Sequence, residues 1–334
     1  MNTNFKIVRI DVDGANASMV DERSALVNQI NVDLDAYNCV TEEEIIAAAQ
    51  DADVIITENA NISRRVLESL LKCKAVIRYG VGYDTVDVGG ATDNRVMVIN
   101  VPDFCGEEVS NHVMTFLLGY CKKLILLNAL TKKGRWAEAK SKQIPMGSIY
   151  NETLGIIGCG NLGRFVARKA IAFNMNVIGY DKYLPKETAE IYGIKLVSLE
   201  ELLSSSDYIT LHVALTEETK HMIGEKELNL MKPSCVLINT SRGPVVDEKA
   251  LIIALNNNQI AGACLDVFEI EPAGASNPLL SMENVIVTPH CASYSDAAFR
   301  RLRISVIKEA LRIKNGERPI SVVNKSVKPK VVLK

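Results

Sequence analysis

Short apolar runs alternate with helical segments along almost the whole chain. In the first hundred residues, runs rich in valine and isoleucine predict buried strands, at 5–10, 54–57, 75–78 and 96–101. Between these runs, Thr41 and Glu44 have the spacing of a capping box at the start of a helix, and Ser63 can cap the next helix. Strands that alternate with helices predict a parallel sheet covered on both faces.

A second alternation of the same kind follows a long helical segment. Apolar residues recur at helical spacing over 107–133, so we expect one long helix there, followed by a polar linker that contains Trp136. Six further strands are expected, at 154–157, 176–180, 208–212, 235–239, 262–267 and 285–288. A last helix is expected over about 295–314, with Asn315 and Gly316 as its C-cap. The pattern therefore predicts two α/β units.

The most informative segment is a glycine-rich turn between an expected strand and an expected helix. Gly158 permits a tight turn, Gly160 lets a pyrophosphate approach bare backbone, and Gly163 allows the helix to pack close to the sheet. The first helical amides, at Asn161 and Leu162, would face the phosphates. This segment predicts a dinucleotide site.

An acid stands where the next strand ends. Asp181 lies 18 residues after Gly163, a distance suited to a carboxylate that binds a ribose diol. Lys182 follows directly, and a lysine there can favour a 2′-phosphate, although the retained carboxylate would repel it. We therefore expect NAD as the cofactor rather than NADP.

Three residues that can perform chemistry stand at strand-to-loop boundaries of the second unit. Arg242 can hold a carboxylate, His290 can exchange a proton near neutral pH, and Glu271 can orient the imidazole. Each alone also fits a structural role, as a loop cation, a satisfied histidine or a solvated acid. Together, beside a nicotinamide, they favour oxidation of a 2-hydroxy acid or reduction of a 2-keto acid.

Composition and charge exclude several other classes of protein. A net charge of -2 gives no reason to expect nucleic acid or an anionic membrane as a partner. Eight scattered cysteines without a C-x-x-C pair favour free thiols in a reducing compartment, so we expect a cytoplasmic protein. The most apolar stretch, 113–130, is interrupted by two lysines, and no membrane span is expected. His112, His212 and His221 lack metal-ligand spacing, so no metal site is expected, and Cys291 is interpreted as an inert neighbour of the histidine.

Several motifs in the same order resemble those of the D-isomer-specific 2-hydroxyacid dehydrogenases, from about residue 6 to 324. They are Gly158–Gly163 with Asp181, His212-Val213-Ala214-Leu215-Thr216, Asn239-Thr240-Ser241-Arg242-Gly243, Asp266 with Glu271-Pro272, and Thr288-Pro289-His290. The resemblance implies Arg242, Glu271 and His290 as the catalytic set. It also implies an α/β protein of two doubly wound parallel-sheet domains. These are a flavodoxin-like substrate domain (1–103 and 293–334) and a Rossmann NAD-binding domain (104–292), with the ligand in a cleft between them and a homodimer as the assembly.

The resemblance assigns further roles residue by residue. In the segment Tyr79-Gly80-Val81-Gly82-Tyr83-Asp84, the amides of Val81 and Gly82 are expected to bind the substrate carboxylate. Asp266 matches the residue expected to bind the nicotinamide carboxamide, and the matching motifs place His212, Val213 and Thr240 among the cofactor-binding residues. Arg78 could bind a second substrate anion or be a solvated strand end.

The segments around Arg78 and residues 101–109 look most like the branch of the C-terminal-binding proteins and of bacterial relatives labelled phosphoglycerate dehydrogenases. Asn111 departs from the family, where many members have a glutamate, so the substrate stays open. An alternative hypothesis is an NAD(H)-sensing, corepressor-like binding protein with little turnover. A formate- or phosphite-type dehydrogenase is a further alternative. The formate type resembles this pattern but has a glutamine at the position of Glu271, which argues against it.

Overall fold

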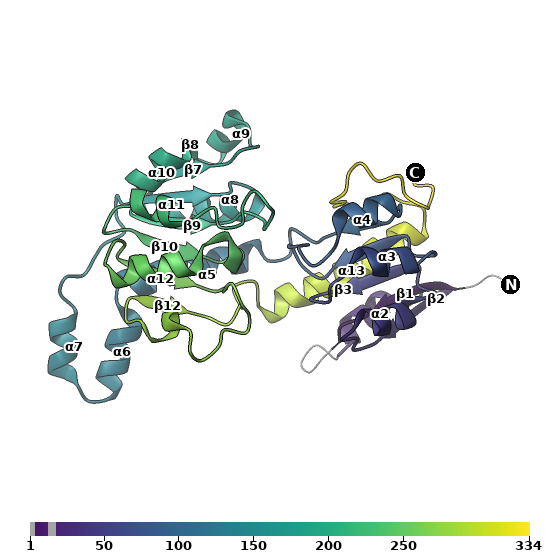
Figure 1. Cartoon of the computed structure of the whole chain (residues 1–334), viewed down its shortest axis with the longest axis horizontal. Helices are drawn as coiled ribbons and strands as arrows, with labels where there is room; N and C mark the ends of the chain where they lie inside the picture. Colours follow the sequence, from purple (N-terminus) through teal and green to yellow (C-terminus); the bar gives the residue numbers. More distant parts are fainter. Residues whose placement is uncertain (1–3, 13–17) are drawn as a thin grey trace. The chain divides into compact units, whose positions relative to one another are not determined.

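The computed structural model describes residues 4–12 and 18–334 of the chain. The protein divides into two units, Met1–Phe104 with Ser295–Lys334, and Cys105–Tyr294 (Figure 1). The boundaries expected from the sequence fall within two residues of these. Each unit is built on an all-parallel sheet with helices packed against it, so the predicted class of two doubly wound α/β domains is confirmed.

The first unit contains a five-stranded sheet with the order β2-β1-β3-β4-β5, a flavodoxin-like order. Its strands are β1 Phe5–Arg9, β2 Val32–Ala36, β3 Val54–Thr57, β4 Ala75–Arg78 and β5 Met97–Ile99. Its helices are α1 Val20–Ala25, α2 Glu42–Ala49, α3 Arg64–Ser69, α4 Val88–Asp93 and α13 Asp296–Lys314. The capping box of Thr41 and the cap by Ser63 are both present. Strand β2, which alternates apolar and acidic residues at the edge of the sheet, was not predicted.

The second unit contains a seven-stranded sheet with the order β12-β11-β10-β9-β6-β7-β8. Its strands are β6 Thr153–Ile157, β7 Asn176–Tyr180, β8 Lys195–Leu196, β9 Tyr208–Leu211, β10 Val236–Asn239, β11 Gly262–Leu265 and β12 Val285–Val287. Its helices are α5 Gly106–Cys121, α6 Leu124–Lys132, α7 Trp136–Lys142, α8 Asn161–Ala172, α9 Lys186–Ile191, α10 Leu199–Ser205, α11 Glu225–Leu230 and α12 Glu248–Asn256, with two short 3₁₀ helices, η2 Gly243–Val245 and η3 Pro278–Ser281. Strand order reverses between β6 and β9, where an open parallel sheet forms its ligand crevice.

The single long helix expected over 107–133 is wrong. Two helices, α5 and α6, meet there at a bend of 62°. Lys123 adopts a left-handed conformation with φ 49°, which ends the first helix and redirects the chain. The expected linker also contains a helix, α7, which packs against α6. Of the described helices, no single one has the length and apolar character to span a membrane, although α5 and α6 together meet both criteria.

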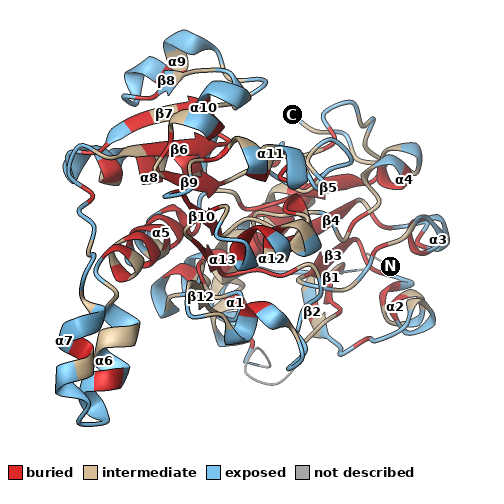
Figure 2. Ribbon diagram, turned by 60° about the vertical axis from the view of Figure 1, so that its left-hand side comes forward, coloured by how far each residue is buried: buried red, intermediate tan, exposed pale blue. Residues whose placement is uncertain are grey.

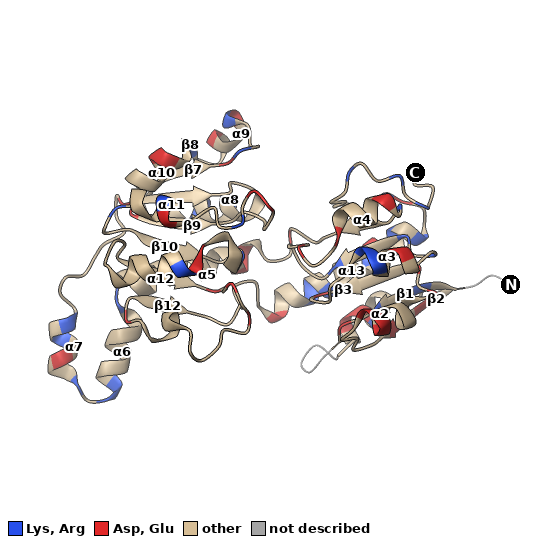
Figure 3. Cartoon of the chain, in the orientation of Figure 1, with Lys and Arg blue, Asp and Glu red and all other residues tan. Residues whose placement is uncertain are grey.

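The cores lie in the two sheets and under the helices that face them (Figure 2). Strands β3, β9, β10 and β11 are buried over their whole length, as expected for parallel strands covered on both faces. All eight cysteines are free thiols, and seven are buried. Acidic and basic residues are interspersed over each unit (Figure 3).

Candidate active site

The residues predicted to bind cofactor and to perform chemistry in the second unit all follow the carboxyl ends of its parallel strands. Gly158 follows β6, Asp181 follows β7, His212 and Val213 follow β9, Thr240 and Arg242 follow β10, Asp266 and Glu271 follow β11, and His290 follows β12. Because parallel strands end at the same edge, the sheet brings residues that are more than a hundred positions apart to one side of the unit.

The glycine turn depends on the absence of side chains at two of its positions. Gly158 has φ +92°, and a Cβ there would lie 2.7 Å from the carbonyl carbon of His212. A Cβ at Gly163 would lie 2.3 Å from the carbonyl oxygen of Gly158. A Cβ at Gly160, by contrast, would meet no protein atom within 4 Å among the described residues. Packing within the protein therefore explains the first and third glycines and leaves the second without a structural requirement.

Helix α8 begins directly after this turn. Gly160 is its N-cap and supplies no side-chain acceptor, and the first helical hydrogen bond of the turn runs from the Arg164 amide to the Gly160 carbonyl at 3.1 Å. The amides at the start of the helix, including that of Leu162, precede the first intrahelical bond, so a negatively charged ligand can accept from them.

The carboxylate of Asp181 is held by three backbone amides. Its Oδ2 accepts from Cys159 at 2.9 Å, and its Oδ1 accepts from Tyr183 and Leu184 at 2.9 Å each. A carboxylate has about four acceptor positions, so roughly one is left for a ribose hydroxyl. The side chain also joins the end of β7 to the glycine turn that follows β6.

Two side chains at this edge contain a buried polar atom without a protein partner. Within the described part of the chain, these atoms are Oγ1 of Thr240 and Nδ1 of His212. The other ring nitrogen of His212 lies 3.0 Å from Oγ1 of Thr210. Burial lowers the pKa of His212 to about 4, so its ring is neutral at physiological pH. A buried polar atom that lacks a partner lowers the stability of the protein. Such an atom is expected where a bound ligand supplies the missing hydrogen bond.

Glu271 and His290 form a hydrogen-bonded pair. Nδ1 of His290 lies 2.6 Å from Oε2 of Glu271, and Oε1 of Glu271 accepts from the Phe268 amide at 2.9 Å. Burial alone would raise the pKa of Glu271, but the His290 hydrogen bond, the Phe268 amide and the charges of His290 and Arg242 together hold that pKa below its usual value. Glu271 is therefore a carboxylate, and it leaves the Nε2 of His290 as the ring nitrogen that can exchange a proton.

The backbone of His290 is in an unusual conformation. Its φ is +50°, in the left-handed region that side chains with a Cβ rarely adopt. The conformation is held by its amide, which donates to the carbonyl oxygen of Asp266 at 2.8 Å. A strained backbone conformation persists only where the surrounding structure stabilises it, and such positions cluster at functional sites.

Arg242 is placed by the close contact of two loops. A Cβ at Gly243 would lie 1.8 Å from the carbonyl oxygen of Phe268, so only glycine allows the loop after β10 to reach the loop that contains Glu271. Asn239 holds the turn from within, accepting from the Ser241 amide at 3.0 Å and donating to the Arg242 carbonyl at 2.9 Å. This role of Asn239 was not predicted, because it depends on the local turn.

Asp266 organises the loop that precedes α13. Its Oδ1 accepts from the Thr288 hydroxyl at 2.5 Å and from the Cys291 amide at 2.9 Å, and its Oδ2 accepts from the Ala292 amide at 2.8 Å. The carboxylate is buried, so these bonds fix both sides of His290. The sequence predicted Asp266 as a site residue but gave no indication of this clamp.

In the first unit, the predicted substrate-binding loop follows β4. Among the described residues, the amides of Val81 and Gly82 donate to no protein acceptor. The Val81 carbonyl accepts from Asn100 at 2.7 Å, which fixes the loop. Arg78 folds back onto the same loop, and its Nη1 donates to the Tyr79 carbonyl at 2.5 Å.

A buried ionic cluster behind this loop was also missed. Arg9 forms an ion pair with Glu22 at 3.0 Å, and the Tyr79 hydroxyl donates to the same carboxylate at 2.6 Å. The guanidinium of Arg9 also lies 4.5 Å from the centre of the Tyr79 ring. An arginine within an apolar strand was the available signal, since a buried charge requires partners.

Comparison with known proteins is in line with this geometry. Residues 114–292 match the family model described as D-isomer specific 2-hydroxyacid dehydrogenase, NAD binding domain. The chain is 40% identical over 287 residues to a D-3-phosphoglycerate dehydrogenase of Methanocaldococcus jannaschii, and the match covers 85% of this chain and 54% of that protein. It is 39% identical over 289 residues to a glyoxylate reductase of Korarchaeum cryptofilum, covering 86% of this chain and 87% of the relative.

A solved structure agrees over nearly the whole length. The acyclic imino acid reductase Bsp5, in complex with NADPH and D-Arg, is 33% identical and superposes with a TM-score of 0.83, covering 96% of this chain and 100% of that one. The chain thus spans about half of the Methanocaldococcus jannaschii relative and most of the other two proteins.

Proposed function

The chain belongs to the D-isomer-specific 2-hydroxyacid dehydrogenase family, and we propose that it interconverts a 2-keto acid and a D-2-hydroxy acid with NAD(H). Family membership makes it an NAD-linked oxidoreductase. The observation that carries the residue-level proposal is the pair of His290 and Glu271, joined at 2.6 Å beside the loop of Arg242.

The cofactor residues we propose fit a dinucleotide. The pyrophosphate would lie over Gly160 and accept from the amides of Asn161 and Leu162, since packing gives no other reason for a glycine there. Asp181 would bind the adenosine ribose. His212 and Thr240 have the buried atoms that a bound cofactor would satisfy, and Val213 adjoins the glycine turn. Asp266, which holds the His290 loop, would also meet the nicotinamide carboxamide.

The proposed chemistry assigns one task to each catalytic side chain. The cofactor, when bound, supplies or accepts the hydride. In reduction, the Nε2 of protonated His290 gives its proton to the carbonyl oxygen of the keto acid, while Nδ1 donates to Glu271. Arg242 holds the substrate carboxylate and stabilises the negative charge that develops on the oxygen. In oxidation, neutral His290 removes the hydroxyl proton.

We propose the first unit as the substrate domain. The amides of Val81 and Gly82 would donate to the substrate carboxylate, which is supported by their lack of protein acceptors in the described structure. Arg78, whose Nη1 donates to its own loop, would bind the second anion of a phosphorylated keto acid, whereas a small keto acid such as glyoxylate would leave it to hold that loop. The names of the relatives cover both kinds of substrate.

We also propose a cytoplasmic homodimer without nucleic acid or membrane partners. Leu124 and Ile125 on α6 are more than half exposed, which supports a partner subunit on this helix. Eight free thiols support a reducing compartment. Light scattering coupled to size exclusion tests the assembly, and a monomeric mass would exclude the dimer.

The direct test is NADH oxidation by the purified protein with glyoxylate, hydroxypyruvate, pyruvate, a branched keto acid and phosphohydroxypyruvate. We expect turnover on at least one acid, its loss in Arg242→Ala and in His290→Ala, and little change in NADH binding in the latter. Turnover that persists in His290→Ala would exclude the proposed acid. NADH binding without turnover, with an NADH-dependent change in elution volume, would instead support the corepressor-like alternative.

A further inference from the structure

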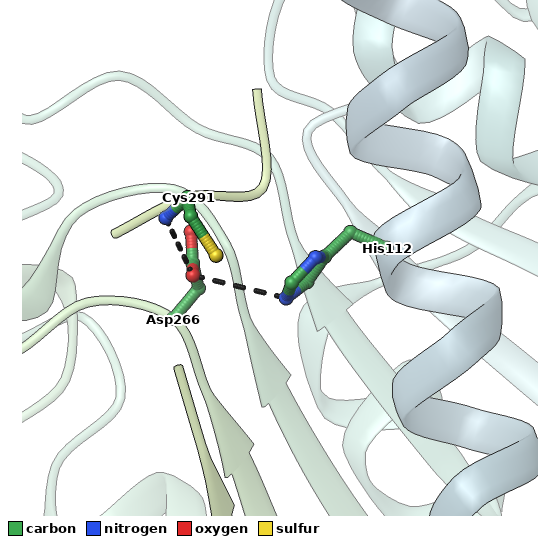
Figure 4. Close-up of side chains that lie close together, drawn as sticks. All are labelled: His112, Asp266 and Cys291. Atoms are coloured by element: carbon green, nitrogen blue, oxygen red, sulfur yellow. Dashed lines mark hydrogen bonds and ion pairs between the residues drawn. The ribbon is translucent and has the colours of Figure 1, made fainter. Parts of the chain in front are cut away.

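Three side chains from distant parts of the second unit place metal-binding atoms close together. His112 lies on α5, Asp266 follows β11 and Cys291 follows β12 (Figure 4). Their ligand atoms all lie within 4.8 Å of one another, and Nε2 of His112 is 3.7 Å from Oδ1 of Asp266. Sequence spacing could not indicate this cluster, because 154 positions separate the histidine from the aspartate.

We propose that His112, Asp266 and Cys291 form a site for one divalent cation of the zinc class. An imidazole nitrogen, a carboxylate oxygen and a thiolate are the donors that Zn²⁺ prefers, and three protein ligands leave a fourth position for water. Asp266 and the thiolate together carry two negative charges, which balance the charge of the cation. Magnesium and calcium, which prefer oxygen ligands, would not use this set.

The geometry needs only a small contraction. With metal–ligand distances of about 2.0–2.3 Å, tetrahedral ligands lie roughly 3.3–3.8 Å apart. The separation of His112 and Asp266 is already within this range, and the thiol sulfur lies within 4.8 Å of both of their ligand atoms. Cys291 is partly exposed and the His112 side chain is 18% exposed, so an ion can reach them from solvent.

The surroundings both favour and limit binding. Burial lowers the pKa of His112, which keeps a lone pair on its ring, and burial together with Asp266 raises the pKa of the Cys291 thiol, which a metal must deprotonate. In the metal-free protein His112 lies 3.0 Å from the Thr288 hydroxyl, which in turn donates to Asp266. A cation on Oδ1 of Asp266 replaces this last hydrogen bond and releases the thiol proton to solvent. The lost hydrogen bond and the deprotonation of the thiol both lower the affinity, so we expect moderate metal affinity.

Occupation of the site would reach the proposed catalytic histidine. Asp266 holds the amides of Cys291 and Ala292, and its own carbonyl accepts from His290. A cation bound to Asp266 weakens the hydrogen bond from Thr288 and occupies the carboxylate that we propose for the nicotinamide carboxamide. We therefore expect a bound cation to inhibit turnover, an inference that rests on the proposed function.

The test of binding uses Co²⁺ as the probe and the cofactor-free full chain. Cobalt in a mixed sulfur and nitrogen site gives visible absorption bands together with a thiolate charge-transfer band. We expect one Co²⁺ per chain with both bands, loss of the thiolate band in Cys291→Ser, and an affinity at least about tenfold weaker in His112→Gln. His221→Gln is the matched control, because His221 also pairs with a carboxylate, that of Glu269, away from this cluster.

Wild-type protein without these bands, or an unchanged thiolate band in Cys291→Ser, would overturn the proposal. Thermal unfolding of each metal-free variant shows that it is folded. Binding is read without any substrate, so a failure of the keto-acid assay leaves this result intact. If turnover is found, zinc should inhibit the wild type at concentrations at which Cys291→Ser keeps its own zinc-free rate, and equal inhibition of both would contradict an inhibitory role.

Discussion

Gly243 determines how closely the arginine loop and the glutamate loop approach each other, and Gly243→Ala tests that contact. The added Cβ would lie 1.8 Å from the Phe268 carbonyl oxygen and 1.9 Å from the carbonyl carbon, whereas ordinary contact begins at 3.4 Å. The two loops must separate by 3.4 − 1.8 = 1.6 Å, because both obstacles are backbone atoms. Overpacking of this kind costs about 1–3 kcal/mol of stability.

The same movement displaces Arg242 from the pair of Glu271 and His290. A misplacement of about 1 Å can cost roughly 100-fold in turnover, so we expect kcat/KM to fall by at least that factor. The assay is NADH oxidation with the best substrate of the keto-acid panel, combined with thermal unfolding.

Gly119→Ala is the matched control for this substitution. Among the described residues, a Cβ at Gly119 meets no atom within 4 Å outside its own helix, so this change should leave turnover unaltered and stabilise α5 by about 0.5–1 kcal/mol. A Gly243→Ala protein with the activity and melting temperature of the wild type would refute the argument from loop contact.

Three further predictions concern hydrogen bonds and pH. Glu271→Gln keeps the shape of the side chain but removes the charged acceptor that orients the ring of His290, so kcat should fall by about 100-fold or more while the NADH dissociation constant, measured by fluorescence, stays the same. Tyr79→Phe removes the 2.6 Å hydrogen bond to buried Glu22 and should cost about 1.5–3 kcal/mol in urea unfolding, and a change below 0.5 kcal/mol would contradict a stabilising cluster. Because the pKa of His212 falls from 6.5 to about 4 on folding, the unfolded chain binds the proton more readily between these values, and stability is lost as the pH falls through this window by up to about 3 kcal/mol. His212→Gln should flatten this dependence in unfolding curves recorded from pH 7 to pH 4.

The sequence predicted the fold well where burial determines the pattern. Parallel strands covered on both faces are continuous apolar runs, so β3, β4, β6 and β9 were found within a residue or two. The edge strands β2 and β8 were missed. In β2, apolar residues alternate with acidic ones, and β8 has only two residues. The bend at Lys123 was missed for another reason, because apolar residues at helical spacing continue through it and only the local φ angle reveals the break.

The site was predictable to the extent that topology sets it. In a parallel sheet every strand ends at the same edge, so residues that directly follow strands can be grouped from the sequence alone. Contacts between loops cannot be inferred in this way. The approach of Gly243 to Phe268, and the donation of two amides to Asp266, depend on how two irregular segments pack.

The choice between NAD and NADP shows why such local contacts matter. In the sequence, Lys182 and Asp181 favour different cofactors, since a free lysine attracts a 2′-phosphate and a free carboxylate can turn away from it. In the structure, neither side chain is free. Lys182 forms an exposed ion pair with Glu218, at 3.0 Å from both carboxylate oxygens, while three amides, one of them in the glycine turn, hold Asp181. The carboxylate therefore cannot rotate away without breaking these bonds, and the preference for NAD(H) that we propose follows from backbone geometry as much as from the identity of the acid.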